Sequence, residues 1–123
     1  SDRAIATASH KTGAIVSDYT AAPIYFSAQS NGAHEWLIEF DTPPGKMDEF
    51  IYELDAALKN ANSDYEAKRH KDIALRMPVV KALPQGTFSK WLYTKNKVGG
   101  QHKIPRLSND RNILEEILAI AKE

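Results

Sequence analysis

The stretch HEWLIEFDTPPGKMDEFIYELDAALKNAN, residues 34–62, decides the fold because its hydrophobic period changes halfway along. In residues 35–40, Trp36, Ile38 and Phe40 share one face of an extended chain. The opposite face holds Glu35, Leu37 and Glu39. This alternation is the pattern of a β-strand that buries at least one side.

From Met47 onward the apolar residues recur every three or four positions, which is the period of an amphipathic helix. Its stripe consists of Met47, Phe50, Ile51, Leu54, Ala57 and Leu58, and Pro43 and Pro44 suit the approach to a helix. Burial of the five large side chains at about 1.5–3 kcal/mol each would make this helix a main anchor of the core.

The residues before this stretch predict a helix and a first strand. Residues 2–12 have a weak apolar stripe, with Asp2 as a plausible cap and Gly13 as a plausible stop. Residues 14–20 read as a strand whose continuation is limited by Pro23, and Asn31-Gly32 is a strong turn signal. The two strands should therefore form a hairpin with a longer loop.

The residues after it continue the alternation of helices and strands. We expect a short helix capped by Ser63, a strand over residues 79–83, a helix starting near Thr87 and a last helix after the capping residues 108–110. The whole chain, 1–123, then forms a single α+β domain, with a small mixed β-sheet of three or four strands flanked by helices. The start of the sequence, which lacks a methionine, suggests a piece excised from a larger protein.

Composition excludes several classes of function. Lys and Arg balance Asp and Glu at 16 each, so no net field draws the molecule to nucleic acid or to an anionic membrane. The sequence has no apolar run long enough to cross a bilayer, and it has no cysteine for disulfides, thiolate metal sites or a thiol nucleophile. The lack of cysteine suits a cytoplasmic protein.

The histidines and the paired glutamates are better explained as ordinary structural or surface residues than as metal ligands or catalytic groups. The four histidines have neither a helix-face spacing nor a HExxH pattern, so we expect no metal site. Glu35 and Glu39 share a strand face but read as common surface glutamates rather than a catalytic pair.

The stretch YEAKRHKD, residues 65–72, carries the basic run Lys68 to Lys71. One interpretation is a contact to RNA or to a protein, with Tyr65 available for stacking. The other is a solvated helix end, where cations meet the negative pole of the helix dipole. Composition favours the second, so a nucleic-acid partner is not expected.

The stretch GGQHKIPRLSND, residues 99–110, is the most unusual loop. It lacks the pattern of a phosphate-binding P-loop. Gly99 and Gly100 permit unusual backbone angles, and Pro105 pushes the residue before it toward an extended conformation. Lys103 is thus placed on an extended strut hinged by two glycines, which could deliver a cation to a site or could simply be a solvated loop.

Five segments in order resemble the carboxy-terminal domain of the Gretchen Hagen acyl acid–amido synthetases. These are the auxin-responsive-promoter enzymes of plants and their bacterial relatives. The segments are DYTAAPIYF (18–26), HEWLIEFD (34–41), NSDYEAKR (62–69), PQGTFSKWL (84–92) and GGQHKIPRLSND (99–110). Plant members differ at Gly99, Gly100 and His102, so the resemblance is closer to a bacterial-type member.

The resemblance implies a function that composition and spacing alone do not. Such enzymes belong to the adenylate-forming superfamily, use ATP and Mg²⁺ to convert a carboxylic acid to an acyl-adenylate, and pass the acyl group to an amino acid. Their small carboxy-terminal domain closes over a large amino-terminal adenylation domain and rotates between the two half-reactions. By this resemblance the parent is a ligase. The isolated domain, which has no adenylate-forming signature loop or acid pocket, should be inactive and bind no cofactor alone.

The resemblance also suggests roles for residues. Lys103, in the segment QxKxPR, would be the catalytic lysine that contacts the acyl carboxylate and the phosphate. Gln101 and Arg106 would contact the nucleotide or hold the strut, in which Gly99, Gly100 and Pro105 form the hinge and support. Tyr65 and Arg69 match a Tyr-x-x-x-Arg spacing of the family, with a role that could be structural.

Overall fold

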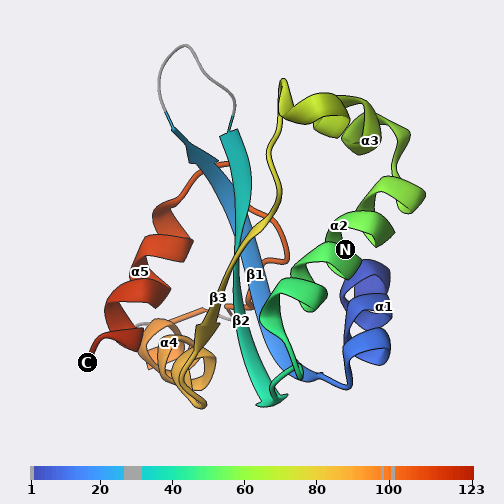
Figure 1. Cartoon of the computed structure of the whole chain (residues 1–123). Coiled ribbons are helices and arrows are strands. Elements are labelled where there is room, and N and C mark those ends of the chain that lie inside the picture. Colours follow the sequence, from blue (N-terminus) through green and yellow to red (C-terminus); the bar gives the residue numbers. More distant parts are fainter. Residues whose placement is uncertain (1, 27–31, 98, 101) are drawn as a thin grey trace.

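The computed structural model describes residues 2–26, 32–97, 99–100 and 102–123. In chain order the elements are α1 (Asp2–Thr12), β1 (Ile15–Tyr25), β2 (Gly32–Thr42), α2 (Met47–Ala61), α3 (Ser63–Arg69), the short 3₁₀ helix η1 (His70–Asp72), β3 (Val79–Leu83), α4 (Thr87–Lys97) and α5 (Asn112–Ala121). Figure 1 shows three layers, with the sheet between α4 and α5 on one face and the α1 to α3 helices on the other.

The sheet has the order β1-β2-β3 and is mixed. The predicted hairpin is present, because β1 and β2 pair antiparallel from Ile15↔Thr42 to Tyr25↔Gly32. β2 and β3 pair in parallel from Glu35↔Val79 to Glu39↔Leu83. A parallel pair needs a crossover connection, which α2 and α3 provide. The predicted α+β class with a small mixed sheet is therefore confirmed.

The alternation along β2 divides the core in two. One cluster joins the sheet to α1 and α2 and contains Ile5, Ala8, Tyr19, Trp36, Ile38, Phe40, Phe50 and Leu54. The other joins the sheet to α4 and α5 and contains Ala22, Leu37, Leu83, Phe88, Trp91, Leu114 and Ile117. The face assignment predicted for β2 is confirmed, and Phe50 and Leu54 of the predicted helix stripe are fully buried.

The expectation that Pro23 limits the first strand was wrong. The strand was expected over residues 14–20, but β1 continues past Pro23. The backbone N–H and C=O of Ala21 both bond to segment 106–108, on the side away from β2. Pro23, two residues further on, faces the same way, so its missing N–H costs no bond to β2. Its carbonyl accepts a hydrogen bond from Arg111 at 3.0 Å.

Helix boundaries agree with the sequence within a residue or a few. α1 ends before Gly13, whose φ of +75° is the left-handed conformation expected of a stop. The cap predicted at Ser63 was wrong by one position, because the side chain of Asn62 accepts the backbone N–H groups of Asp64 and Tyr65. In the parts of the chain that the structure describes, no helix combines the length and the apolarity needed to span a membrane.

Candidate functional site

The loop before the predicted catalytic lysine begins with a glycine turn. α4 ends at Lys97, and Gly99 and Gly100 have φ values of +110° and +80°. Glycine adopts such angles without the steric cost that other residues meet. The Gly99 N–H donates to the carbonyl of Asn96 at 3.2 Å, and the His102 N–H donates to the Asn96 side-chain oxygen at 2.8 Å. The end of α4 thus fixes the entry to the loop. Gln101 lies outside the described residues.

Residues 102–108, which we call the strap, then run along the outer edge of β1. The Thr20 hydroxyl donates to the Pro105 carbonyl at 2.6 Å. The Ala21 N–H donates to the Arg106 carbonyl at 3.1 Å, and the Ser108 N–H donates to the Ala21 carbonyl at 3.0 Å. The strap therefore covers part of a strand edge that would otherwise be open, and it is attached to the domain on both sides of Lys103.

Lys103 itself is exposed. Within the described ranges its ammonium forms no ion pair, whereas most neighbouring cations have a carboxylate partner. A solvated, unpaired ammonium on a backbone anchored at both ends can meet an anion that lies outside this chain.

Arg106 is bound within its own domain by a group that we call the clamp, formed by Asp2, Asp18, Tyr19 and Arg106. Its Nη1 hydrogen bonds to Asp18 Oδ1 and donates to the Tyr19 carbonyl at 2.9 Å. Its Nε lies 3.4 Å from Asp2 Oδ1, and its Cζ lies 4.4 Å from the centroid of the Tyr19 ring. The Tyr19 hydroxyl donates to Asp2 in turn.

Protonation in the clamp is fixed by these contacts. Burial alone would lower the pKa of Arg106, but the hydrogen bond to Asp18 and the charge of that carboxylate raise it. Burial and the hydrogen bond to Asp2 raise the pKa of Tyr19, so its phenol remains a donor at neutral pH. The side chain of Arg106 is nevertheless 46% exposed, so the structure holds the strap through Arg106 without closing it off from solvent.

Tyr65 and Arg69 of α3 both hydrogen bond to the same residue of α2, Asp55. The Tyr65 hydroxyl donates to Asp55 Oδ1 at 2.6 Å, and Arg69 binds both Asp55 oxygens, at 2.7 Å from Nε and 2.9 Å from Nη2. Asp55 and Arg69 are only 4% and 6% exposed. The geometry gives the Tyr-x-x-x-Arg spacing a structural task, which is to tie α3 to α2.

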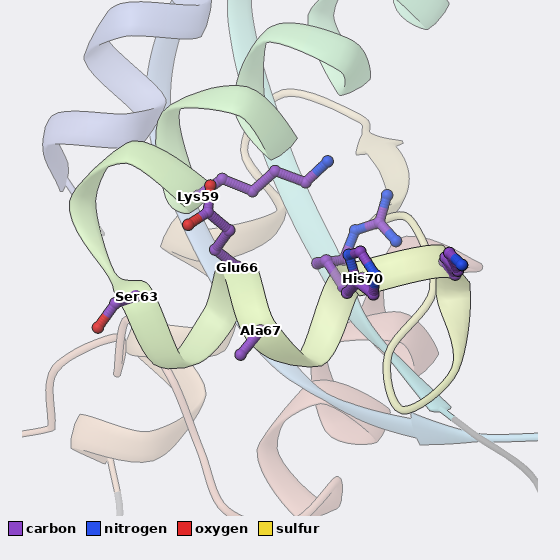
Figure 2. A pocket seen from close by; sticks show the side chains of 7 residues that line it. Lys59, Ser63, Glu66, Ala67 and His70 are labelled. Carbon is purple, nitrogen blue, oxygen red and sulfur yellow. The ribbon is translucent and has the colours of Figure 1, made fainter.

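The basic run from Lys68 to Lys71 is divided by this arrangement. As part of the basic run, Arg69 would lie at a contact surface or at a solvated helix end, but it is buried against Asp55. Lys68 pairs with Asp64 on the same helix. Figure 2 shows the open hollow between α2 and α3, with Lys59, Glu66 and His70 at its rim. A carboxylate stands among the cations there, so no observation favours RNA binding at this place.

Glu35 was expected at the surface and is fully buried. The reason is that helices cover both faces of the sheet, with α4 and α5 on the face that carries Glu35. Glu35 Oε1 lies 2.9 Å from Arg111, and Oε2 lies 2.8 Å from Lys81. Burial would raise the pKa of Glu35, but these two cations together hold it below its ordinary value. This ion-pair network joins β2 to β3 and to the start of α5.

Glu39 is also buried, at 9% exposure, and it caps a helix from a distance. Its Oε1 accepts the backbone N–H of Phe88 at 3.1 Å, in the first turn of α4. The first turn of a helix leaves N–H groups without intrahelical partners and favours a negative charge. Glu39 therefore fixes the start of the helix that leads into the glycine turn.

Removal of this cap should weaken the domain. Glu39→Ala is expected to lower the free energy of unfolding by about 1–2 kcal/mol, as for other lost N-caps. Glu39→Gln retains an acceptor and should cost less than half as much. Urea unfolding of the 123-residue chain measures both, and equal losses for the two variants would show that Phe88 does not depend on the acceptor.

The described part of the chain contains no group of three His, Asp or Glu side chains placed to hold a metal ion. The structure brings the predicted Lys103, Pro105 and Arg106 together on the strap, and it places Tyr65 and Arg69 in a separate buried cluster. Two residues that organise these sites, Asp18 and Asp55, were not singled out from the sequence. Asp55 had a visible signal, because it lies on the apolar stripe of α2 beside Leu54 and Leu58.

Comparison with known proteins gives a family and a fold. A family model described as "GH3 family C-terminal domain" matches residues 1–112. A solved structure described as "GH3.15 acyl acid amido synthetase" matches with a TM-score of 0.70 at 20% identity, covering 97% of this chain and 21% of that chain. Another, "AtGH3.15 acyl acid amido synthetase in complex with 2,4-DB", matches with a TM-score of 0.71 at 19% identity, covering 97% and 22%.

These solved structures share the fold with this chain, which spans about a fifth of their length. No curated protein sequence matches it.

Proposed function

The chain belongs to the GH3 family, whose C-terminal domain it matches over residues 1–112, and we propose that it is the mobile small domain of an ATP-dependent acyl acid–amido synthetase. In this proposal an N-terminal adenylation domain of the same protein holds most of the ATP and acid site. The small domain closes on it for acyl-adenylate formation and then rotates for transfer of the acyl group to an amino acid.

One observation carries the proposal: Lys103 is exposed and without an ion-pair partner among the described residues, on a strap that is attached at both ends. In adenylation a carboxylate oxygen attacks the α-phosphorus of ATP, and the bond to the β-phosphate breaks as pyrophosphate leaves. An ammonium beside the reacting groups offsets the negative charge that develops on the phosphorus and on the leaving group. It also holds the acid in line for attack.

The attachment of the strap affects how Lys103 would reach its site. Hydrogen bonds to α4 and to β1 hold the backbone on either side of this residue. Lys103 would therefore be carried by rotation of the whole domain, with the glycine turn serving as a fixed corner. Magnesium is assigned no ligand on this chain and would accompany ATP.

Lys103→Ala tests the proposal in the full-length parent enzyme. ATP–pyrophosphate exchange with a substrate acid should fall roughly 100- to 1,000-fold, the usual effect of removing one group that stabilises transition-state charge. Amide formation from acyl-adenylate supplied to the enzyme should change much less, because that half-reaction uses another orientation of the domain.

Lys97→Ala is the matched control, since it removes an exposed lysine from the last turn of α4, just before the glycine turn. It should leave exchange unchanged. Full exchange activity in the folded Lys103→Ala enzyme would remove Lys103 from the mechanism.

A further inference from the structure

We propose that the clamp of Asp2, Asp18, Tyr19 and Arg106 is a positioning device that sets the reach of Lys103 during adenylation. The inference rests on the proposed role of Lys103, and it assigns a task to residues of α1 and β1 that this role does not include. Arg106 belongs to the strap that carries Lys103, whereas Asp18 and the Tyr19 carbonyl belong to β1.

The short connection between the two residues supports this coupling. Only Ile104 and Pro105 separate Lys103 from Arg106. The ring of Pro105 fixes its φ angle and restricts Ile104 to extended conformations, so this dipeptide has little conformational freedom. Ile104 also packs against the core between the sheet and α5. A displacement of Arg106 along β1 would therefore move the backbone of Lys103 by a similar amount.

The chemistry of the clamp suits alignment more than general stability. One guanidinium makes an ion pair, a hydrogen bond to a carbonyl and a cation–π contact, which together define its place in three directions. At the same time its side chain is 46% exposed, and exposed ion pairs contribute little to the free energy of folding. A clamp of this kind can be lost with a small effect on unfolding and a large effect on geometry.

A direct contact between Arg106 and the nucleotide is the competing explanation. In that case Asp18 would be incidental, Arg106→Ala would raise the KM for ATP, and the loss would persist without Lys103. In the positioning role, Asp18 and Arg106 act together, the loss is in kcat, and it depends on the presence of Lys103. The two explanations therefore differ in three measurable ways.

The experiment is a double-mutant cycle in the full-length parent, read out by ATP–pyrophosphate exchange. Arg106→Ala should lower kcat by roughly 10- to 100-fold, the cost of a misplacement of about 1 Å, with little change in the KM for ATP. Asp18→Asn should act in the same direction, and Arg106→Lys should restore part of the loss. In the Lys103→Ala background, Arg106→Ala should cause no further loss.

Arg3→Ala, which removes an exposed arginine of α1 outside the clamp, is the control and should leave exchange unchanged. Thermal unfolding shows that each variant is folded, and Asp18→Asn and Arg106→Lys keep the test valid if Arg106→Ala does not fold.

The outcomes separate the two proposals. Full activity in the Lys103→Ala enzyme would reject the proposed function. Two results would reject the positioning role alone, provided that Lys103→Ala severely lowers exchange. One is unchanged exchange activity in Arg106→Ala. The other is a double variant in which the two fold-losses multiply, as they do for independent residues. A raised KM for ATP with a silent Asp18→Asn would assign Arg106 to the nucleotide instead.

Discussion

Arg69→Ala is expected to lower the free energy of unfolding of the 123-residue chain by about 3–5 kcal/mol, the usual cost of breaking a buried ion pair from one side. The substitution removes both guanidinium hydrogen bonds from the Asp55 carboxylate, which is 4% exposed, and leaves it with the Tyr65 hydroxyl and the Lys59 ammonium. It also removes the hydrogen bond from Arg69 to the Leu75 carbonyl at 3.1 Å. Urea unfolding followed by circular dichroism measures the loss.

Three variants control this prediction. Lys68→Ala removes the neighbouring cation, which pairs with Asp64 on the helix surface, and should change stability by no more than about 0.5 kcal/mol. Arg69→Lys keeps the charge but cannot bind both Asp55 oxygens, so an intermediate loss is expected. Tyr65→Phe removes one hydrogen bond to Asp55 and should cost about 1–3 kcal/mol. Equal stability of Arg69→Ala and Lys68→Ala would show that the buried pair does not hold α3 in place.

The Arg69 cluster explains why the basic run was difficult to interpret from the sequence. A run of cations at the end of a short helix has the same appearance whether each residue is solvated or one of them is buried. The partner, Asp55, lies 14 positions earlier in another helix. Only the packing of α3 on α2 distinguishes Arg69 from Lys68, and that packing is not a local property of the sequence.

Elements set by hydrophobic period, in contrast, could be predicted well. β2 and α2 follow from their periods of two and of three to four residues, because the period states directly which side chains face the core. β3 and α4 were found at nearly their observed bounds for the same reason. The first strand was predicted too short because the rule against proline in strands depends on which way the missing N–H faces. That direction is decided by the register of β1 on β2, and strand order decides that, among the described residues, no third strand lies on that side of β1.

Strand order also explains Glu35 and Glu39. Their alternation with Trp36 and Ile38 predicts the correct face but not what covers that face. The parallel addition of β3 makes β2 central, and α4 and α5 then cover the glutamates. The candidate site shows the same limit, since the sequence indicates the strap through Lys103 and the two glycines that precede it. Its attachment to Asp18, 88 positions away from Arg106, appears only in the fold.

The second large effect is a loss of stability on acidification. It is expected because cations from other elements keep two buried carboxylates ionised in the folded chain. Burial would raise the pKa of both Asp55 and Glu35, but hydrogen bonds and charges from their partners hold both values below the ordinary range. The unfolded chain then binds protons more readily than the folded one. Their contribution to stability is complete above about pH 5 and is lost as the pH falls through about 4 toward the lowered folded values.

Within that window each carboxylate lowers the free energy of unfolding by at most about 1.4 kcal/mol per pH unit, so the slope for the two together has an upper limit of about 3 kcal/mol per unit. Urea unfolding at a series of pH values from 7 to 2 measures it. His34 makes a separate contribution, since burial lowers its pKa and the resulting loss begins as the pH falls below about 6.5. Asp55→Asn and Glu35→Gln should each be less stable at pH 7, and the free energy of unfolding of each variant should depend less on pH below pH 4. An unchanged slope in the double variant would mean that other carboxylates cause the acid unfolding.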